Sequence, residues 1–113
     1  MSDFGTADAI ALYNVDRWGN GYFTINSDGH VAVRPTARKK EEIDLMEVVE
    51  EAKSRGLSFP LVVRFQDLLR HRVSTINRAF AEAIREHDYK GCYRGVFPIK
   101  VNQLREVVEE ILH

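Results

Sequence analysis

The sequence predicts an α/β protein that begins with a β-hairpin and continues as strands alternating with helices. Two observations support this fold class. Residues 20–34 contain two β-rich runs separated by turn-forming residues. After residue 60, short apolar runs alternate with long amphipathic segments, a pattern that favours a parallel sheet covered by helices. The hairpin does not fit the alternation, so we expect it to belong to a separate β-rich unit.

The hairpin is the first β-structure that the sequence predicts. Its strands are expected at residues 20–25 and 31–34, because both runs are rich in β-branched and aromatic residues. Residues 26–29 lie between them and are typical turn formers. A weakly helical segment over residues 7–13 precedes the hairpin, and the charged residues 36–42 follow it as a solvated connector.

Three amphipathic helices are predicted after the connector. The first should begin after a cap at Asp44 and end before Gly56, which can adopt the left-handed conformation that stops a helix. The second opens at Asp67, and its apolar residues recur every three or four positions as one stripe. The third is expected to be capped by Asn102. It still runs at His113, which indicates a chain cut within an element.

Two apolar strands are predicted between these helices, over residues 61–65 and 92–99. Both are short runs bounded by proline or glycine and followed by a helical pattern. The order after residue 60 is therefore strand, helix, strand, helix.

Composition excludes several classes of protein. The chain has 113 residues, 44% of them hydrophobic and 29% charged, with a formal net charge of −1. This near-neutral balance argues against nucleic acid or an anionic membrane surface as the main partner. No stretch approaches the roughly 20 apolar residues that cross a bilayer, and the N-terminus lacks the features of a signal peptide. Cys92 is the only cysteine and is expected to be buried, so we predict no internal disulfide and a cytoplasmic location.

Lys100 is the candidate catalytic residue. Among the five lysines, it alone lies within an apolar run, directly before a predicted helix. A lysine amine forms Schiff bases with carbonyl cofactors such as pyridoxal 5′-phosphate (PLP), and (β/α) barrels carry their chemistry where a strand hands over to a helix. The alternative is a structural lysine at a strand end whose amine reaches water. The histidines show no metal-ligand spacing, so no metal site is predicted.

Several stretches together resemble the biosynthetic arginine decarboxylases, and the resemblance extends over residues 10–112. It is carried by residues 16–23 and 31–35, by residues 43–45, 60–65 and 67–69, and by residues 93–103. The last stretch, which contains Gly95-Val96-Phe97-Pro98-Ile99-Lys100-Val101-Asn102-Gln103, is similar to the one that carries the PLP lysine of that family.

The resemblance implies the fold of the alanine racemase and ornithine decarboxylase group, a PLP-binding (β/α)8 barrel with a β-sandwich domain. Residues 1–42 would then hold the hairpin of the β domain, and residues 43–113 would open the barrel. A complete barrel needs on the order of 250 residues, so only its beginning fits here. Lys100 would be both the catalytic residue and the Schiff-base lysine for PLP, and no other active-site residue of the family would fall inside this chain.

The implied function is the conversion of L-arginine to agmatine and CO2 in polyamine biosynthesis, by a PLP-dependent lyase. The family also implies a magnesium requirement and a homo-oligomer, a dimer or a tetramer. No ligand set for magnesium is visible in the sequence. The chain alone is expected to be inactive and poorly stable, because it cannot close a barrel.

Three alternatives remain open at this point. The first is a related PLP decarboxylase acting on ornithine, diaminopimelate or carboxyspermidine. The second is a PLP-binding carrier or regulator without catalysis. The third is an α/β fragment with an incidental lysine.

Overall fold

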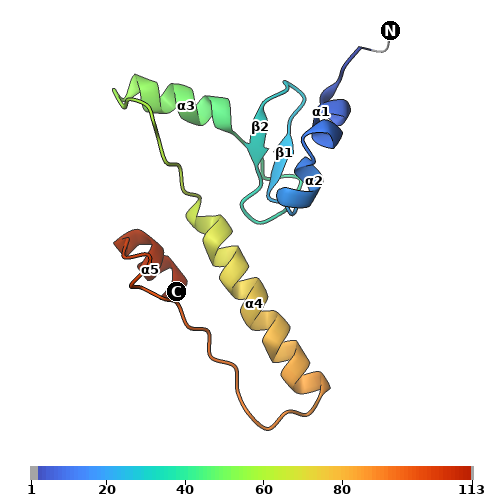
Figure 1. Cartoon of the computed structure of the whole chain (residues 1–113), viewed down its shortest axis with the longest axis vertical. Helices are drawn as coiled ribbons and strands as arrows, with labels where there is room; N and C mark the ends of the chain where they lie inside the picture. Colours follow the sequence, from blue (N-terminus) through green and yellow to red (C-terminus); the bar gives the residue numbers. More distant parts are fainter. Residues whose placement is uncertain (1–2, 113) are drawn as a thin grey trace. The chain divides into compact units, whose positions relative to one another are not determined.

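The computed structural model describes residues 3–112, which divide into two compact units (Figure 1). The first unit ends at Arg64 and the second begins at Phe65. No helix within residues 3–112 is long and apolar enough to cross a membrane.

The first unit contains a small antiparallel sheet and three helices. Its elements are α1 (Thr6–Leu12), α2 (Val15–Trp18), β1 (Phe23–Ile25), β2 (Val31–Val33), β3 (Ile43–Asp44) and α3 (Leu45–Ser54). The predicted hairpin is confirmed, with Phe23 opposite Val33 and Ile25 opposite Val31. A third strand, which the sequence did not predict, pairs with the other edge of β2 and places Asp44 opposite Ala32.

The core of this unit lies where α2 and the hairpin meet. Val15, Tyr22, Ala32 and Val33 are buried, and Val33 is fully so. Gly19 follows α2 at a close approach of the chain, where an added Cβ would lie 2.5 Å from the carbonyl oxygen of Val15. Only glycine fits that position without a shift of the backbone.

Helix α3 begins and ends as the sequence predicts. The side chain of Asp44 accepts a hydrogen bond from the backbone N–H of Met46 and so caps the first turn. Gly56 follows the helix with a φ of +77°, the left-handed conformation expected of a glycine stop.

The second unit consists of two helices joined by an extended segment. Helices α4 (Gln66–Glu86) and α5 (Arg105–Leu112) confirm two of the predicted helices. Helix α5 lies beside the first half of α4 (Figure 1). The Arg70 guanidinium of α4 donates to the Glu110 carboxylate of α5 at 2.5 Å, and the side chain of Glu110 is only 8% exposed.

The strands predicted at residues 61–65 and 92–99 are wrong for the described chain. Neither segment belongs to a strand, and the sheet within residues 3–112 is antiparallel, not parallel. A strand exists only where a neighbouring strand accepts and donates its backbone hydrogen bonds, and the sheet of the described residues, which contains β1, β2 and β3, includes neither segment. Mixed α and β content is the part of the predicted fold class that the structure confirms.

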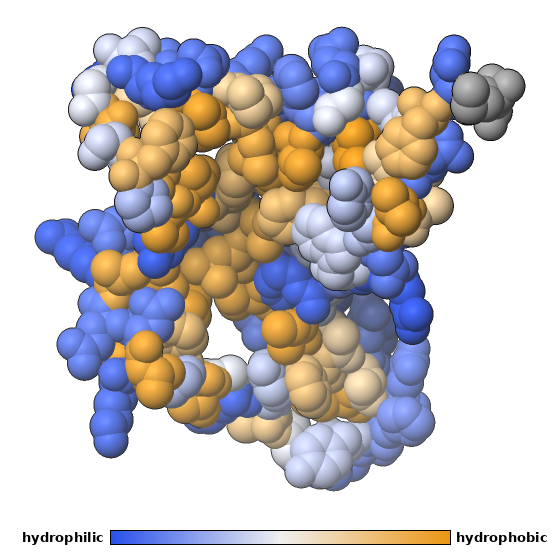
Figure 2. Space-filling view, turned by 45° about the horizontal axis from the view of Figure 1, so that its top comes forward, coloured by the Kyte–Doolittle hydropathy of each residue, from blue (hydrophilic) through white to orange (hydrophobic). Residues whose placement is uncertain are grey.

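These unpaired segments expose apolar side chains. Val62 is 78% exposed and Val96 is 90% exposed. Figure 2 shows hydrophobic residues over much of the visible surface. The sequence therefore has the apolar pattern of two buried strands, but the described residues contain no strand that pairs with either segment.

Candidate functional site

Lys100 lies in a tight turn between the extended segment and helix α5. The backbone N–H of Val101 donates to the carbonyl of Pro98 at 3.1 Å, and that of Asn102 donates to the carbonyl of Ile99 at 3.1 Å. These two consecutive bonds wind the chain around Lys100 before α5 begins at Arg105. The strand-to-helix position predicted for the lysine is thus, in this structure, a turn that precedes a helix.

The side chain of Lys100 is exposed to solvent. Within residues 3–112 its amine has no hydrogen-bond or ion-pair partner. The other lysine at a turn, Lys90, pairs with Asp88 at 2.5 Å, and Lys53 on α3 pairs with Glu50 at 2.8 Å. Among the described residues, Lys100 is thus an exposed primary amine without a competing carboxylate, and a primary amine is a group that can condense with an aldehyde.

Asn102 does not cap helix α5 as predicted. Its side-chain oxygen accepts from the backbone N–H of Leu104 at 3.4 Å, one residue before the helix begins. The first carbonyl that receives helical bonds is that of Leu104, which accepts from Val107 and Val108. The Asn102 side chain therefore bonds to the residue before α5 and not to the N–H groups of the first turn of the helix.

An apolar groove lies beside the lysine turn, in the second unit. It has a volume of about 480 Å³ and is bounded by α4, α5 and the extended segment between them. Ile99, the neighbour of Lys100, contributes to its wall together with Leu69, Val73 and Val108. Such a surface can cover an apolar side chain, but it offers no cluster of charged groups for catalysis.

A metal site is not formed by the described residues. Within residues 3–112 no group of three histidine, cysteine, aspartate or glutamate side chains could hold a metal ion. The magnesium that the family resemblance implies has no ligand set among these residues, and we derive no role for it. Cys92, predicted to be buried, is exposed.

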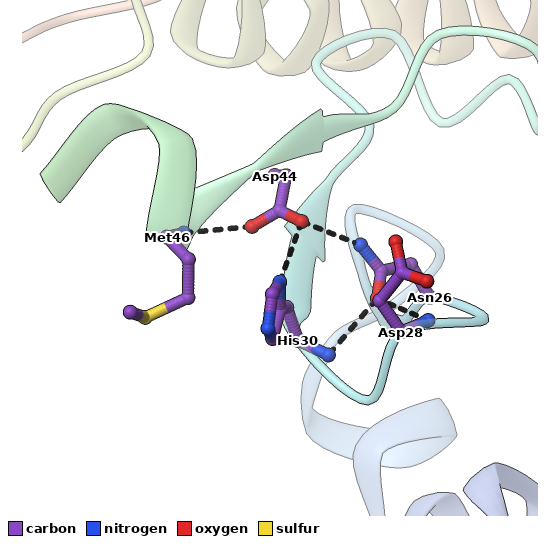
Figure 3. Close-up of polar contacts among 5 residues, drawn as sticks. All are labelled: Asn26, Asp28, His30, Asp44 and Met46. Atoms are coloured by element: carbon purple, nitrogen blue, oxygen red, sulfur yellow. Dashed lines mark hydrogen bonds and ion pairs between the residues drawn. The ribbon is translucent and has the colours of Figure 1, made fainter. Parts of the chain in front are cut away.

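The structure also contains a polar cluster in the first unit, centred on Asp44, that was not predicted from the sequence (Figure 3). One carboxylate oxygen, Oδ2, accepts from Asn26 Nδ2 at 2.8 Å and lies 2.8 Å from His30 Nδ1. The other, Oδ1, accepts from the N–H of Met46 at 2.7 Å. Asn26 in turn accepts from the backbone N–H groups of Asp28 and His30. We call Asn26, His30 and Asp44 the hairpin clasp.

The clasp joins the hairpin turn to the first turn of α3. The hydrogen bond from His30, followed by those from Asn26 and Met46, holds the pKa of Asp44 below its ordinary value of 3.8, although partial burial acts in the opposite direction. Asn26 and His30 lie in one turn, whereas Asp44 is distant in the sequence and reaches them because β3 pairs with β2. A structural role fits this arrangement, since every acceptor in it serves the local backbone or a neighbouring side chain.

The chain is similar over nearly its whole length to proteins named biosynthetic arginine decarboxylase. It is 48% identical over 112 residues to the one from Gloeobacter violaceus, a match that covers 99% of this chain and 17% of that protein. It is 44% identical to the one from Prochlorococcus marinus subsp. pastoris, over 99% of this chain and 19% of the relative. The protein from Prochlorococcus marinus strain MIT 9303 is 50% identical over 94% of this chain and 16% of its own length.

This similarity confirms the resemblance found in the sequence. The chain spans less than one fifth of the length of these curated relatives. No protein-family model matches it.

Proposed function

We propose that this chain is a segment of a biosynthetic arginine decarboxylase, an enzyme that converts L-arginine to agmatine and CO2. The observation that carries the proposal is the identity of 44–50% to three proteins of that name, over 94–99% of the chain. The activity would belong to the longer protein, because the segment matches only 16–19% of each relative.

Lys100 is the residue through which this segment would take part in the reaction. It would hold PLP through its side-chain amine, and PLP, when bound, supplies an electron sink for the loss of CO2. A lysine must present a neutral amine to react with an aldehyde. The exposed, unpartnered side chain of Lys100 supports this role among the described residues, because no carboxylate there competes for the amine.

The exposed apolar segments support a place for this chain at the opening of a (β/α)8 barrel. Residues 61–65 and 92–99 carry the apolar pattern of buried strands, yet Val62 and Val96 are largely exposed in the described chain. In a barrel each strand has a neighbour on both sides, and its side chains pack in the interior or against the helices. The hairpin, within residues 1–42, would then belong to a β domain.

Replacement of Lys100 by arginine in the longer protein tests the proposal. Arginine keeps the positive charge and a similar length, but its guanidinium does not form a stable bond with the aldehyde. We expect release of labelled CO2 from arginine to fall by at least about 100-fold. After borohydride reduction of the parent protein, peptide mapping should place the PLP label on Lys100.

Lys53→Arg is the matched control, because Lys53 is an exposed helix lysine that pairs only with Glu50. It should leave both CO2 release and labelling at Lys100 unchanged. A PLP label on another lysine, or a Lys100→Arg protein that keeps its activity, would disprove the assignment. A protein that releases CO2 from another basic amino acid and not from arginine would disprove the substrate.

A further inference from the structure

The peptide that follows Lys100 is held at both of its polar groups, the N–H by the backbone and the carbonyl by a side chain. The N–H groups of Val101 and Asn102 bond to the carbonyls of Pro98 and Ile99. The carbonyl of Lys100 itself accepts from the side-chain amide of Gln103, with 3.3 Å between Gln103 Nε2 and the oxygen. Gln103 therefore supplies a donor to a carbonyl that neither backbone bond of the turn uses.

This contact bears on the direction of the lysine side chain. The carbonyl oxygen of a residue lies in the peptide plane whose rotation is the ψ angle of that residue. The bond from Gln103 to this oxygen acts together with the bond from the Val101 N–H of the same peptide to Pro98. Both restrain ψ at Lys100, and with it the direction of the Cα–Cβ bond relative to the chain that follows. The lysine stem has four further rotatable bonds, so a restrained base narrows the region that the amine samples.

The chain that follows is itself anchored. Leu104 accepts the first helical bonds of α5, and α5 is fixed to α4 by the buried Val107 and by the ion pair between Arg70 and Glu110. Gln103 lies between the lysine turn and this helix. It therefore transmits the position of α5 to the backbone of Lys100.

We propose that Gln103 is a positioning residue that orients Lys100 toward PLP by holding its backbone carbonyl. The proposal rests on the proposed function of Lys100. It assigns Gln103 no contact with the substrate or with the cofactor. Without this bond the amine should still react, but it should point in the productive direction less often. Misplacement of a reacting group lowers turnover more than it lowers binding.

The test compares two variants of the longer protein with a matched control. Gln103→Met keeps the length and helix propensity of the side chain but removes the donor, whereas Gln103→Arg retains N–H donors. Arg105→Gln is the control, because Arg105 is exposed and pairs only with Glu109 on its own helix. For each protein we would measure the rate of PLP uptake by the cofactor-free form, the borohydride-trapped label on Lys100, and kcat and KM for arginine.

We expect Gln103→Met to slow PLP uptake and to lower kcat by about fivefold, a size in the range of one neutral hydrogen bond, with KM changed by less than about twofold. Gln103→Arg should restore both rates to within about twofold of the parent, and Arg105→Gln should match the parent. If the Gln103→Met protein still carries the label on Lys100 and its rate of PLP uptake and its kcat are unchanged, the role of Gln103 is disproved, but the proposed function of Lys100 is not. A failure of Gln103→Arg to restore both rates would likewise disprove the role of Gln103. Absence of a label on Lys100 in the parent would overturn the proposed function as well.

Discussion

At the scale of single residues, the side chain of Asp44 makes three polar contacts in the first unit, with Asn26, His30 and Met46, and one substitution removes all of them. Its two carboxylate oxygens serve the hairpin turn and the first turn of α3 together. We expect Asp44→Ala to lower the melting midpoint of this unit by about 4–8 °C, the shift typical of one lost helix cap in a domain of this size. Fluorescence of Trp18 reports this unit specifically, because it is the only tryptophan and its ring lies 5.4 Å from that of Phe23.

Asp28→Asn is the control for this substitution. Asp28 lies in the same turn, but only its backbone N–H takes part in the clasp. This variant should melt within about 1 °C of the parent. An equal loss of stability in both variants would show that the turn, and not the shared carboxylate, determines the effect.

Acid should open the same clasp. The pKa of Asp44 is held below its ordinary value of 3.8, first by the hydrogen bond with His30. A carboxyl with a lowered folded-state pKa contributes stability that is present above its ordinary pKa and is lost as the pH falls through the folded-state value. We therefore expect the Trp18 signal to hold as the pH falls toward about 4 and to change below it. In Asp44→Asn this acid transition should be weaker. An acid transition of the same size in that variant would assign it to other carboxyls.

At the scale of elements, the sequence predicts what is local and misses what depends on a partner. Helices α3, α4 and α5 follow from apolar residues at helical spacing, because helical hydrogen bonds form within one segment. The segments 61–65 and 92–99 have the apolar composition of strands, but composition does not supply a neighbour to pair with. Strand β3 was not predicted, because a strand of two residues is too short to show an alternating pattern in the sequence.

In the candidate site, too, the features that depend on local sequence could be predicted and those that depend on strand pairing could not. Lys100 could be singled out from its neighbours, since an isolated lysine in an apolar run before a helix is a local signal. Its assignment to PLP remains a prediction. The hairpin clasp was not predictable from the sequence, because Asp44 meets the turn of Asn26 and His30 only through the pairing of β3 with β2.

In the ion pair between α4 and α5, we expect loss of the arginine to destabilise the protein more than loss of the glutamate. Arg70 is 55% exposed, whereas its partner Glu110 is 8% exposed. Arg70→Met would leave a buried carboxylate without its partner, but Glu110→Met would leave a cation that can turn to water. We expect Arg70→Met to lower the midpoint of the helical circular dichroism signal by about 5 °C or more, and Glu110→Met to lower it by less.

Arg105→Met serves as the control for these two variants. Its partner Glu109 lies on the same helix and both side chains are exposed, so the pair should contribute little. Equal effects of Arg70→Met and Glu110→Met would indicate that the attraction between the charges, not the burial of the carboxylate, governs this contact.

At the scale of the whole chain, the buried apolar side chains are unevenly distributed. The first unit buries Val15, Tyr22, Ala32 and Val33, whereas among the described residues of the second unit only Val107 is a buried apolar side chain. Burial of apolar surface is the dominant favourable contribution to folding. Apart from the Arg70–Glu110 ion pair and the stacked rings of Phe80 and Tyr93, the second unit therefore has less apolar burial to stabilise it than the first. Its apolar groove and exposed segments are surfaces that a larger protein can cover.

We expect the 113-residue chain to unfold in two separate steps. In a urea titration, the helical signal, to which the 21-residue α4 contributes most, should fall at a lower concentration than the Trp18 fluorescence of the first unit. The same purified chain should release no agmatine from arginine in the presence of PLP, because it matches less than one fifth of each relative and its described residues gather no catalytic groups around Lys100. Coincident transitions of the two signals would show that the units stabilise each other. Measurable agmatine would contradict this expectation and show that residues of this segment alone complete an active site.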